Sequence, residues 1–107
     1  MRLSKKTLTP FIKTENIGLT ALAEIVGAEP TETDKLMLFF KIGKTTYKKA
    51  IGERLQQLLN KHLGDETDNW GGSEIILEKR TFDKDGEVIE YVDITDVKPN
   101  EAKEDVI

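Results

Sequence analysis

Hydrophobic residues recur at every second position in several short stretches of the chain, which is the spacing of half-buried β-strands. A central window changes to helical spacing and ends at Gly64, a natural residue just past a helix. The helix is expected over residues 53–63, where Leu55, Leu58, Leu59 and Leu63 recur. The strands are expected over residues 19–26, 35–42, 45–51, 74–82 and 87–94.

Two turn sequences predict how these strands pair. Gly43-Lys44 fits a two-residue type II′ hairpin turn, and the segment 83–86 (DKDG) fits the turn of a second hairpin. Five short strands, with the helix between the third and fourth, are typical of the OB-fold, a small β-barrel. A split ferredoxin-like fold is disfavoured because it needs a second helix. The predicted fold class is therefore mainly β with one helix, as a five-stranded OB-fold barrel.

The domain organisation follows from the same pattern. At 107 residues the chain predicts one domain. We expect a flexible arm over residues 1–10, the OB-fold domain over residues 11–97 and an acidic flexible tail over residues 98–107. The chain contains no cysteine, which excludes disulfides and thiolate zinc sites.

Neither a signal sequence nor a membrane span is predicted. The lysines near the start are not followed by an apolar segment, and no apolar run approaches the roughly 20 residues of a membrane helix. We expect a cytoplasmic protein, located in the host-cell cytoplasm if it is viral.

Charge is distributed unevenly along the chain. Residues 1–61 carry 11 Lys/Arg and 6 Asp/Glu, whereas residues 62–107 carry 5 and 14. A protein with a formal net charge of −4 can therefore present a basic face, since anion binding depends on the local field. The alternative is that both halves are ordinary solvated surface.

Several segments together carry a resemblance to a known family. They are the lead-in FIKTENIG, the strands LTALAEIV, LMLFFKI and SEIIL, and the join from the helix-ending LG through DETDNW to a glycine. Over residues 11–94 the chain resembles small OB-fold proteins of phages and mobile elements, which are often regarded as similar to single-stranded-DNA-binding proteins. It departs from them in having Ala50-Ile51-Gly52-Glu53 where relatives are often Asn-rich, and Ser73 where lysine is common.

The first hairpin offers candidate binding residues. Pairing across Gly43-Lys44 puts Phe40 and Tyr47 on the core side and Phe39 between lysines on the outer side. An outward aromatic ring can stack on bases while lysines neutralise phosphates. The predicted nucleic-acid-binding residues are Lys35, Phe39, Lys41, Lys44, Tyr47, Lys48 and Arg54.

Alternatives to that arrangement remain open. Phe39 could instead pack under the N-terminal arm or in a dimer contact. A one-residue slip would send Phe40 outward, and Lys49 on the core side indicates that the return strand bends.

The only tryptophan lies between an acidic loop and two glycines. We interpret Trp70, Gly71 and Gly72 as structural, with the indole closing one end of the barrel and the glycines starting the fourth strand. The alternative, a base-stacking Trp70, is disfavoured because nearby carboxylates repel phosphate. These carboxylates are Asp65, Glu66, Asp68 and Glu74.

Metal binding and catalysis find little support in the sequence. The acidic segments 65–69 and 83–86 lack the ligand spacing of a calcium loop. His62 is the sole histidine, and its place near a helix C-terminus is a sufficient explanation for it. No phosphate-binding or dinucleotide glycine motif occurs, so we expect no enzyme activity, metal or cofactor.

The sequence therefore predicts a non-catalytic protein that binds single-stranded DNA or RNA, from a phage, virus or mobile element. The alternative is a protein-interaction module on the same fold, without nucleic-acid binding. The acidic tail, which ends in Val106-Ile107, could recruit replication or recombination proteins or remain an ordinary solvated terminus. No membrane contact is expected, and a homodimer is left open.

Overall fold

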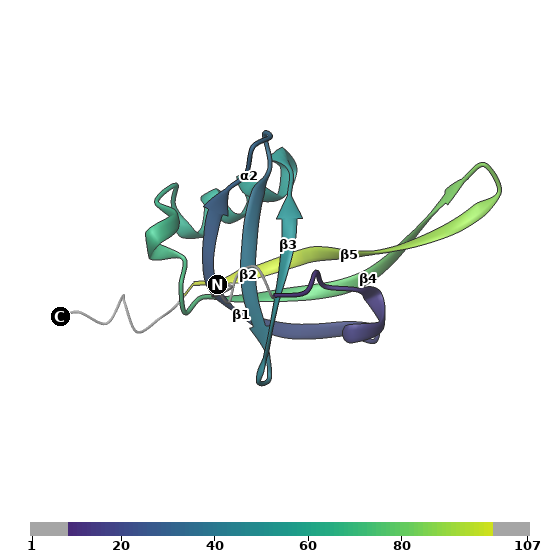
Figure 1. The fold of residues 1–107 in the computed structure, drawn as a ribbon, viewed down its shortest axis with the longest axis horizontal. Coiled ribbons are helices and arrows are strands. Elements are labelled where there is room, and N and C mark those ends of the chain that lie inside the picture. Colours follow the sequence, from purple (N-terminus) through teal and green to yellow (C-terminus); the bar gives the residue numbers. More distant parts are fainter. Residues whose placement is uncertain (1–8, 100–107) are drawn as a thin grey trace, which may run out of the picture.

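Five antiparallel strands and one α-helix make up the part of the chain that the computed structural model describes, residues 9–99 (Figure 1). The predicted class, mainly β with one helix, is confirmed. The predicted terminal segments fall mostly outside the described residues. The elements are η1 (Thr14–Asn16), β1 (Thr20–Pro30), β2 (Leu36–Ile42), β3 (Thr45–Ile51), α2 (Glu53–Leu63), η2 (Thr67–Asn69), β4 (Glu74–Lys84) and β5 (Glu87–Lys98).

The five strands form one sheet in the order β3-β2-β1-β4-β5, with every neighbouring pair antiparallel. Within residues 9–99, β3 and β5 are the two edges and do not pair with each other. The sheet is strongly bent, so that its two halves cross in Figure 1, but it is not closed. The expectation of a closed barrel is therefore not met.

A short segment before η1 lies along the edge of β3. From here on, "the lead-in" means this segment, residues 10–13. The Ile12 N–H donates to the Lys48 carbonyl oxygen at 2.9 Å, and the Lys48 N–H donates to the Pro10 carbonyl oxygen at 3.0 Å. Phe11 forms a parallel bridge with Lys48 between these two bonds. Pro10, the last residue of the expected N-terminal arm, is thus paired with β3.

The hairpin of β2 and β3 has the predicted register. Ile42 pairs with Thr45, Phe40 with Tyr47 and Phe39 with Lys48. Gly43 has a φ of +62°, as the first position of a type II′ turn requires. A two-residue turn fixes the pairing of both strands, which is why a local signal sufficed here.

β1 is longer than predicted because a bulge lets it continue past its expected end. Ile25 pairs with Phe40, the next pair joins Gly27 to Phe39, and Val26 is left as the extra residue. The strand then runs on to Pro30. The sequence places Gly27 directly after an apolar run, which suggests a strand end. In the structure Gly27 lies within β1, directly after the bulge.

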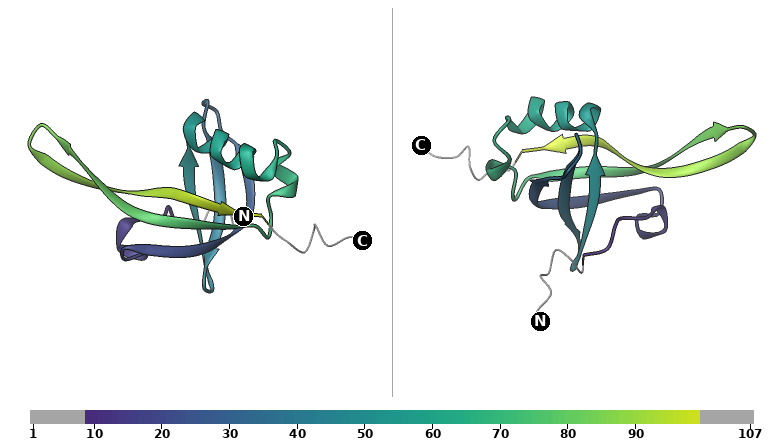
Figure 2. Two further views of the ribbon diagram at one scale, coloured as in Figure 1. Left: turned by 180° about the vertical axis from the view of Figure 1, so that it is seen from behind. Right: turned by 45° about the horizontal axis from the view of Figure 1, so that its top comes forward.

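The second hairpin is also longer than expected, and its turn is shorter. Asp85 and Gly86 are the two turn residues, with φ of +53° and +87°, the type I′ pattern. Beyond the pairing of Thr20 with Glu78, β4 and β5 continue together away from the body (Figures 1 and 2). From here on, "the arm" means residues 81–90 of this projection and not the expected N-terminal arm of residues 1–10.

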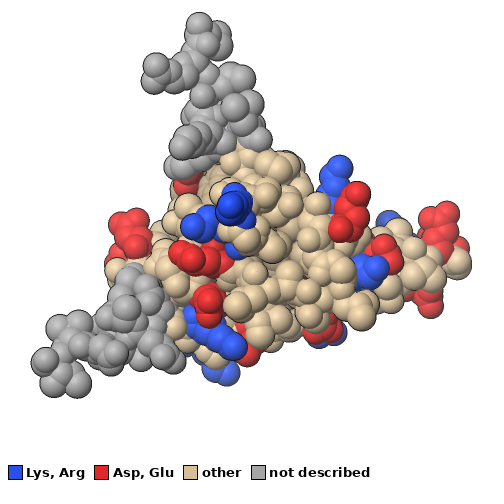
Figure 3. Space-filling model, turned by 90° about the horizontal axis from the view of Figure 1, so that it is seen from below, with Lys and Arg blue, Asp and Glu red and all other residues tan. Residues whose placement is uncertain are grey.

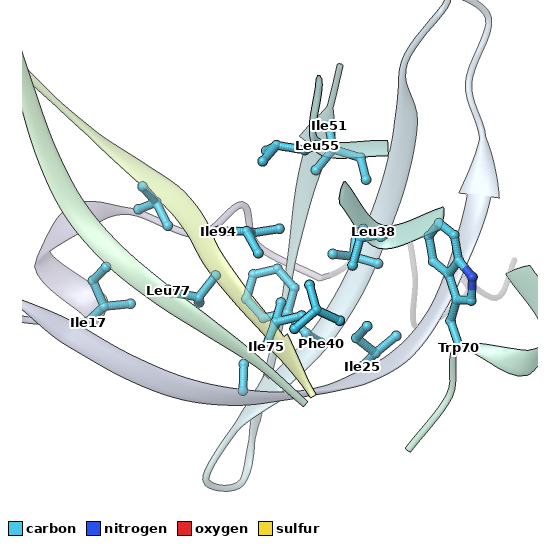
Figure 4. Packing of buried hydrophobic residues seen from close by; sticks show 14 residues of the cluster. Ile17, Ile25, Leu38, Phe40, Ile51, Leu55, Trp70, Ile75, Leu77 and Ile94 are labelled. Atoms are coloured by element: carbon cyan, nitrogen blue, oxygen red, sulfur yellow. The ribbon is translucent and has the colours of Figure 1, made fainter. Parts of the chain in front are cut away.

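The core lies inside the bend of the sheet, and α2 lies across one end of it (Figures 2 and 4). Trp70 is 1% exposed, and its Nε1–H donates to the Gly64 carbonyl oxygen at 2.9 Å. The following backbone pairs with β1, where the Gly72 N–H donates to Ile25 at 2.9 Å. The glycines precede β4 rather than begin it. The core residues are Ile17, Ala23, Ile25, Leu38, Phe40, Ile51, Leu55, Leu59, Trp70, Ile75, Leu77, Val92, Ile94 and Val97.

Replacing the indole tests how much this end of the core contributes. We expect Trp70→Ala to lower the free energy of unfolding by about 3–5 kcal/mol, because it leaves a cavity between α2 and the sheet. Urea denaturation followed by circular dichroism measures the loss. Leu19→Ala is the control, since Leu19 is 76% exposed and its change should stay within about 0.5 kcal/mol. A loss for Trp70→Ala no larger than that of the control would show that Trp70 is not a core residue.

Candidate nucleic-acid interface

The expectation that Phe39 faces solvent is wrong. Its side chain is on the outer face of β2 as predicted, but it is only 7% exposed. β1 continues beside it past the bulge at Val26, and the ring lines a hollow of about 520 Å³ that also borders Thr9 and η2. Glu29 and Asp68 line the same hollow, so it is unfavourable for phosphate. Phe39 is not an open stacking platform.

The other predicted residues on the β2–β3 hairpin are spread apart. Tyr47 is half-buried and packs against the core, which leaves its ring little room to stack on a base. Lys35 and Lys44 are exposed at opposite ends of the hairpin. Lys41 is half-buried on the outer face, opposite Glu24 of β1. The hairpin thus supplies positive charge but no freely exposed aromatic ring.

Two further predicted residues have specific partners. The Lys48 Nζ lies 4.7 Å from the ring centroid of Phe11, a cation–π contact that connects β3 to the lead-in. The Arg54 guanidinium lies 2.9 Å from a carboxylate oxygen of Asp93, although the Arg54 side chain is 71% exposed. The Arg54 guanidinium is therefore already paired with a carboxylate, and binding a phosphate would compete with that ion pair.

A groove between the lead-in, β3 and β5 brings together residues that sequence reasoning did not combine. Phe11 is 52% exposed and Tyr91 is 37% exposed, and both line this groove of about 510 Å³. Three lysines line it as well, one from the lead-in and two from β3. The full lining is Phe11, Ile12, Lys13, Thr14, Glu15, Lys48, Lys49, Ala50, Glu90, Tyr91 and Val92.

The sequence held only a weak signal for this arrangement. Nothing in the residues around Phe11 indicates that its ring stays exposed. Tyr91 stands in an uneven run of polar and apolar residues (EVIEYVDI), which does not assign its face clearly. Phe11 and Tyr91 come to the same groove only because segments far apart in the sequence pack together.

The acidic residues of the groove are partly neutralised by neighbours. Glu90 lies 3.4 Å from the Lys79 ammonium and within 3.5 Å of the Thr14 hydroxyl. Glu15 is exposed on η1. Against these two carboxylates stand Lys13, Lys48 and Lys49, so the groove has a small excess of positive charge.

Lys49 differs from its neighbours in its titration. Burial lowers its pKa below the usual lysine value, and the nearby Lys35 and Arg54 lower it further, while Asp93 acts in the opposite direction. The side chain points to the core side of β3, opposite Leu38, as predicted. Burial therefore makes the charged form of Lys49 less favourable than that of an exposed lysine.

On the face seen in Figure 3, lysine and arginine side chains are interspersed with aspartate and glutamate. Among residues 9–99, no group of three or more His, Asp or Glu side chains is placed to hold a metal ion. In the same part of the chain, no helix has the length and apolar character needed to cross a membrane.

The fold and groove define a mainly β protein with one helix and an open, five-stranded antiparallel sheet. Comparisons with protein-family models, with curated proteins and with solved structures found no match to this chain.

The pH dependence of stability tests the environment of Lys49. Because its pKa is lowered in the folded state, the unfolded state binds more protons between the folded pKa and the ordinary lysine pKa, and stability rises with pH through that window. We expect Lys49→Met to be neutral or stabilising at pH 7, and its advantage to shrink as the pH rises into the window. Urea denaturation at a series of pH values measures this. Lys44→Met, at the exposed turn, is the matched control, and an equal trend in both variants would contradict the assignment.

Proposed function

We propose that this protein binds single-stranded nucleic acid without catalysis, through the groove between the lead-in, β3 and β5. One observation carries the proposal: two accessible aromatic rings, those of Phe11 and Tyr91, line the same groove as three lysines. Aromatic faces and cationic groups along one track are what an unpaired strand requires, since its bases and its phosphates must both be bound.

The energetics of such a groove suit binding that tolerates many sequences. Stacking of one base on an aromatic side chain is worth roughly 1–3 kcal/mol. Each phosphate neutralised by a lysine releases counterions, which makes affinity fall steeply with added salt. Lys13 and Lys48 are the residues to which we assign phosphate contacts here, and Lys41 and Lys44 extend the positive charge along the hairpin.

An OB-fold-like architecture supports the same function. The sheet order, with β1 in the centre and hairpins on both sides, suits a partly open five-stranded barrel of that type, and we infer it for this chain. OB-folds bind oligonucleotides on the face of strands 2 and 3 and the adjoining loops. The resemblance to small OB-fold proteins of phages and mobile elements points the same way. DNA is the expected ligand and RNA the alternative.

A protein-interaction module is the second candidate. It is favoured by large apolar residues that are exposed away from the groove, among them Leu22 at 51%, Val26 at 53% and Phe82 at 47%. Exposed apolar surface of this kind often marks binding sites for proteins. Under this candidate, the groove would not bind oligonucleotides at any ionic strength.

Fluorescence anisotropy with a labelled oligo-dT at two ionic strengths tests the proposal. We expect Phe11→Ala and Tyr91→Ala each to weaken binding by about 1–3 kcal/mol, or roughly 5- to 150-fold, through loss of a stacking face. Lys48→Gln should weaken binding and also reduce its salt dependence, because one phosphate contact is lost.

Two control variants are matched to these changes. Lys61→Gln removes an exposed lysine on α2, outside the groove, and should leave binding nearly unchanged. Phe39→Leu keeps an apolar residue in the separate hollow and should also bind normally. No binding by the unmodified protein at low salt would refute the proposal. Loss of binding in the controls but not in the groove variants would place the site elsewhere.

A further inference from the structure

Most of the arm extends beyond the rest of the sheet, and at its base the Glu90 carboxylate meets the Thr14 hydroxyl at 3.5 Å and the Lys79 ammonium at 3.4 Å. β1 pairs with β4 only as far as Thr20 opposite Glu78, and no strand of residues 9–99 pairs with the arm beyond that point. A two-stranded hairpin alone is marginally stable in water. The arm nevertheless extends far enough to make the described molecule 54 Å long and only 28 Å thick. A hairpin of this kind gains stability when another surface covers it.

Apolar residues on the arm indicate that it is covered. Phe82 is 47% exposed and Val88 is 66% exposed, on opposite faces of the hairpin. The Phe82 ring meets Tyr91 at the base of the arm edge to face, with centroids 5.7 Å apart and planes at 64°. This contact holds the Phe82 ring in place but leaves almost half of it in solvent.

Charge indicates what covers it. The arm carries Asp83, Asp85, Glu87 and Glu90 against the single Lys84. The β2–β3 hairpin, residues 35–51, carries five lysines and no acidic residue. The two hairpins of one chain are thus oppositely charged. They project from the body in different directions, so the tip of the arm lies away from the turn between β2 and β3 of the same molecule (Figures 1 and 2).

We propose that the occupant is a second copy of this chain, with the arm of each copy lying against the β2–β3 hairpin of the other. We assign the pair a two-fold axis, by which the same two copies exchange their arms, and this closes the contact as a dimer rather than a filament. The inference uses the charges and exposure of the two hairpins alone. It does not depend on nucleic-acid binding.

The contact pairs groups of opposite charge. Asp83 and Asp85 at the tip of the arm meet Lys41 and Lys44 at the turn end of the hairpin. Electrostatic complementarity of this kind fixes the choice of partner and weakens with added salt.

Charge reversal followed by mixing tests the proposal. Sedimentation velocity at low ionic strength should give the intact 12.1 kDa chain twice its monomer mass. The arm variant, Asp83→Lys with Asp85→Lys, should be monomeric, as should the hairpin variant, Lys41→Glu with Lys44→Glu. In each variant, positions 83 and 85 at the tip of the arm carry the same charge as positions 41 and 44 at the turn end of the hairpin. An equimolar mixture of the two variants should regain the dimer mass, because positions 83 and 85 of each copy then face positions 41 and 44 of opposite charge in the other.

Controls separate this result from unfolding and from an effect of net charge. Circular dichroism and urea denaturation show whether each variant is folded. Glu32→Lys with Asp65→Lys, and Lys61→Glu with Lys98→Glu, reverse the same number of charges elsewhere and should leave the dimer intact. The proposal is overturned if the unmodified chain is monomeric, if the arm and hairpin variants remain dimers, or if folded variants fail to associate when mixed.

Discussion

The pairing of the lead-in with the edge of β3 is the interaction on which the proposed interface depends. Lys48 donates its backbone N–H to Pro10 and accepts one from Ile12, and its ammonium lies over the Phe11 ring. The lead-in occupies part of the β3 edge, β3 and β5 do not pair with each other, and a groove lies between them. The same contact sets Phe11 beside Lys48, and Tyr91 lines the same groove. One short segment of backbone thus builds one wall of the groove.

The core explains why the walls of that groove are fixed in place. Val92 and Ile94, inner residues of β5, belong to the same buried cluster as Leu38, Phe40 and Trp70. Tyr91 is attached to that cluster through its neighbour Val92. On the outer side, Asp93 is held by the guanidinium groups of Arg54 at 2.9 Å and Arg80 at 3.2 Å. The proposed stacking ring of β5 therefore stands on a strand that is anchored on both faces.

The sequence predicted the features that neighbouring residues determine. It did not predict those that depend on contacts between segments far apart in the chain. The helix bounds and the β2–β3 register were predicted because helical spacing, a glycine and a two-residue turn are local signals. The burial of Phe39 was missed because it depends on a bulge at Val26 of another strand. Phe11 and Tyr91 lie far apart in the sequence, so no local pattern could join them in one groove. Alternation assigned side chains to faces correctly, but it could not show which outer positions other segments cover.

Titration with an unlabelled oligo-dT, followed by ¹H–¹⁵N NMR of the full chain at low salt, tests the central claim most directly because it reports the binding surface residue by residue. If the groove binds single-stranded nucleic acid, the largest shift changes fall on the amides of Phe11, Lys13, Lys48 and Tyr91. Changes at the hollow beside Phe39 should be small. A spectrum that does not change at saturating oligonucleotide, or changes that avoid the groove, would contradict the account.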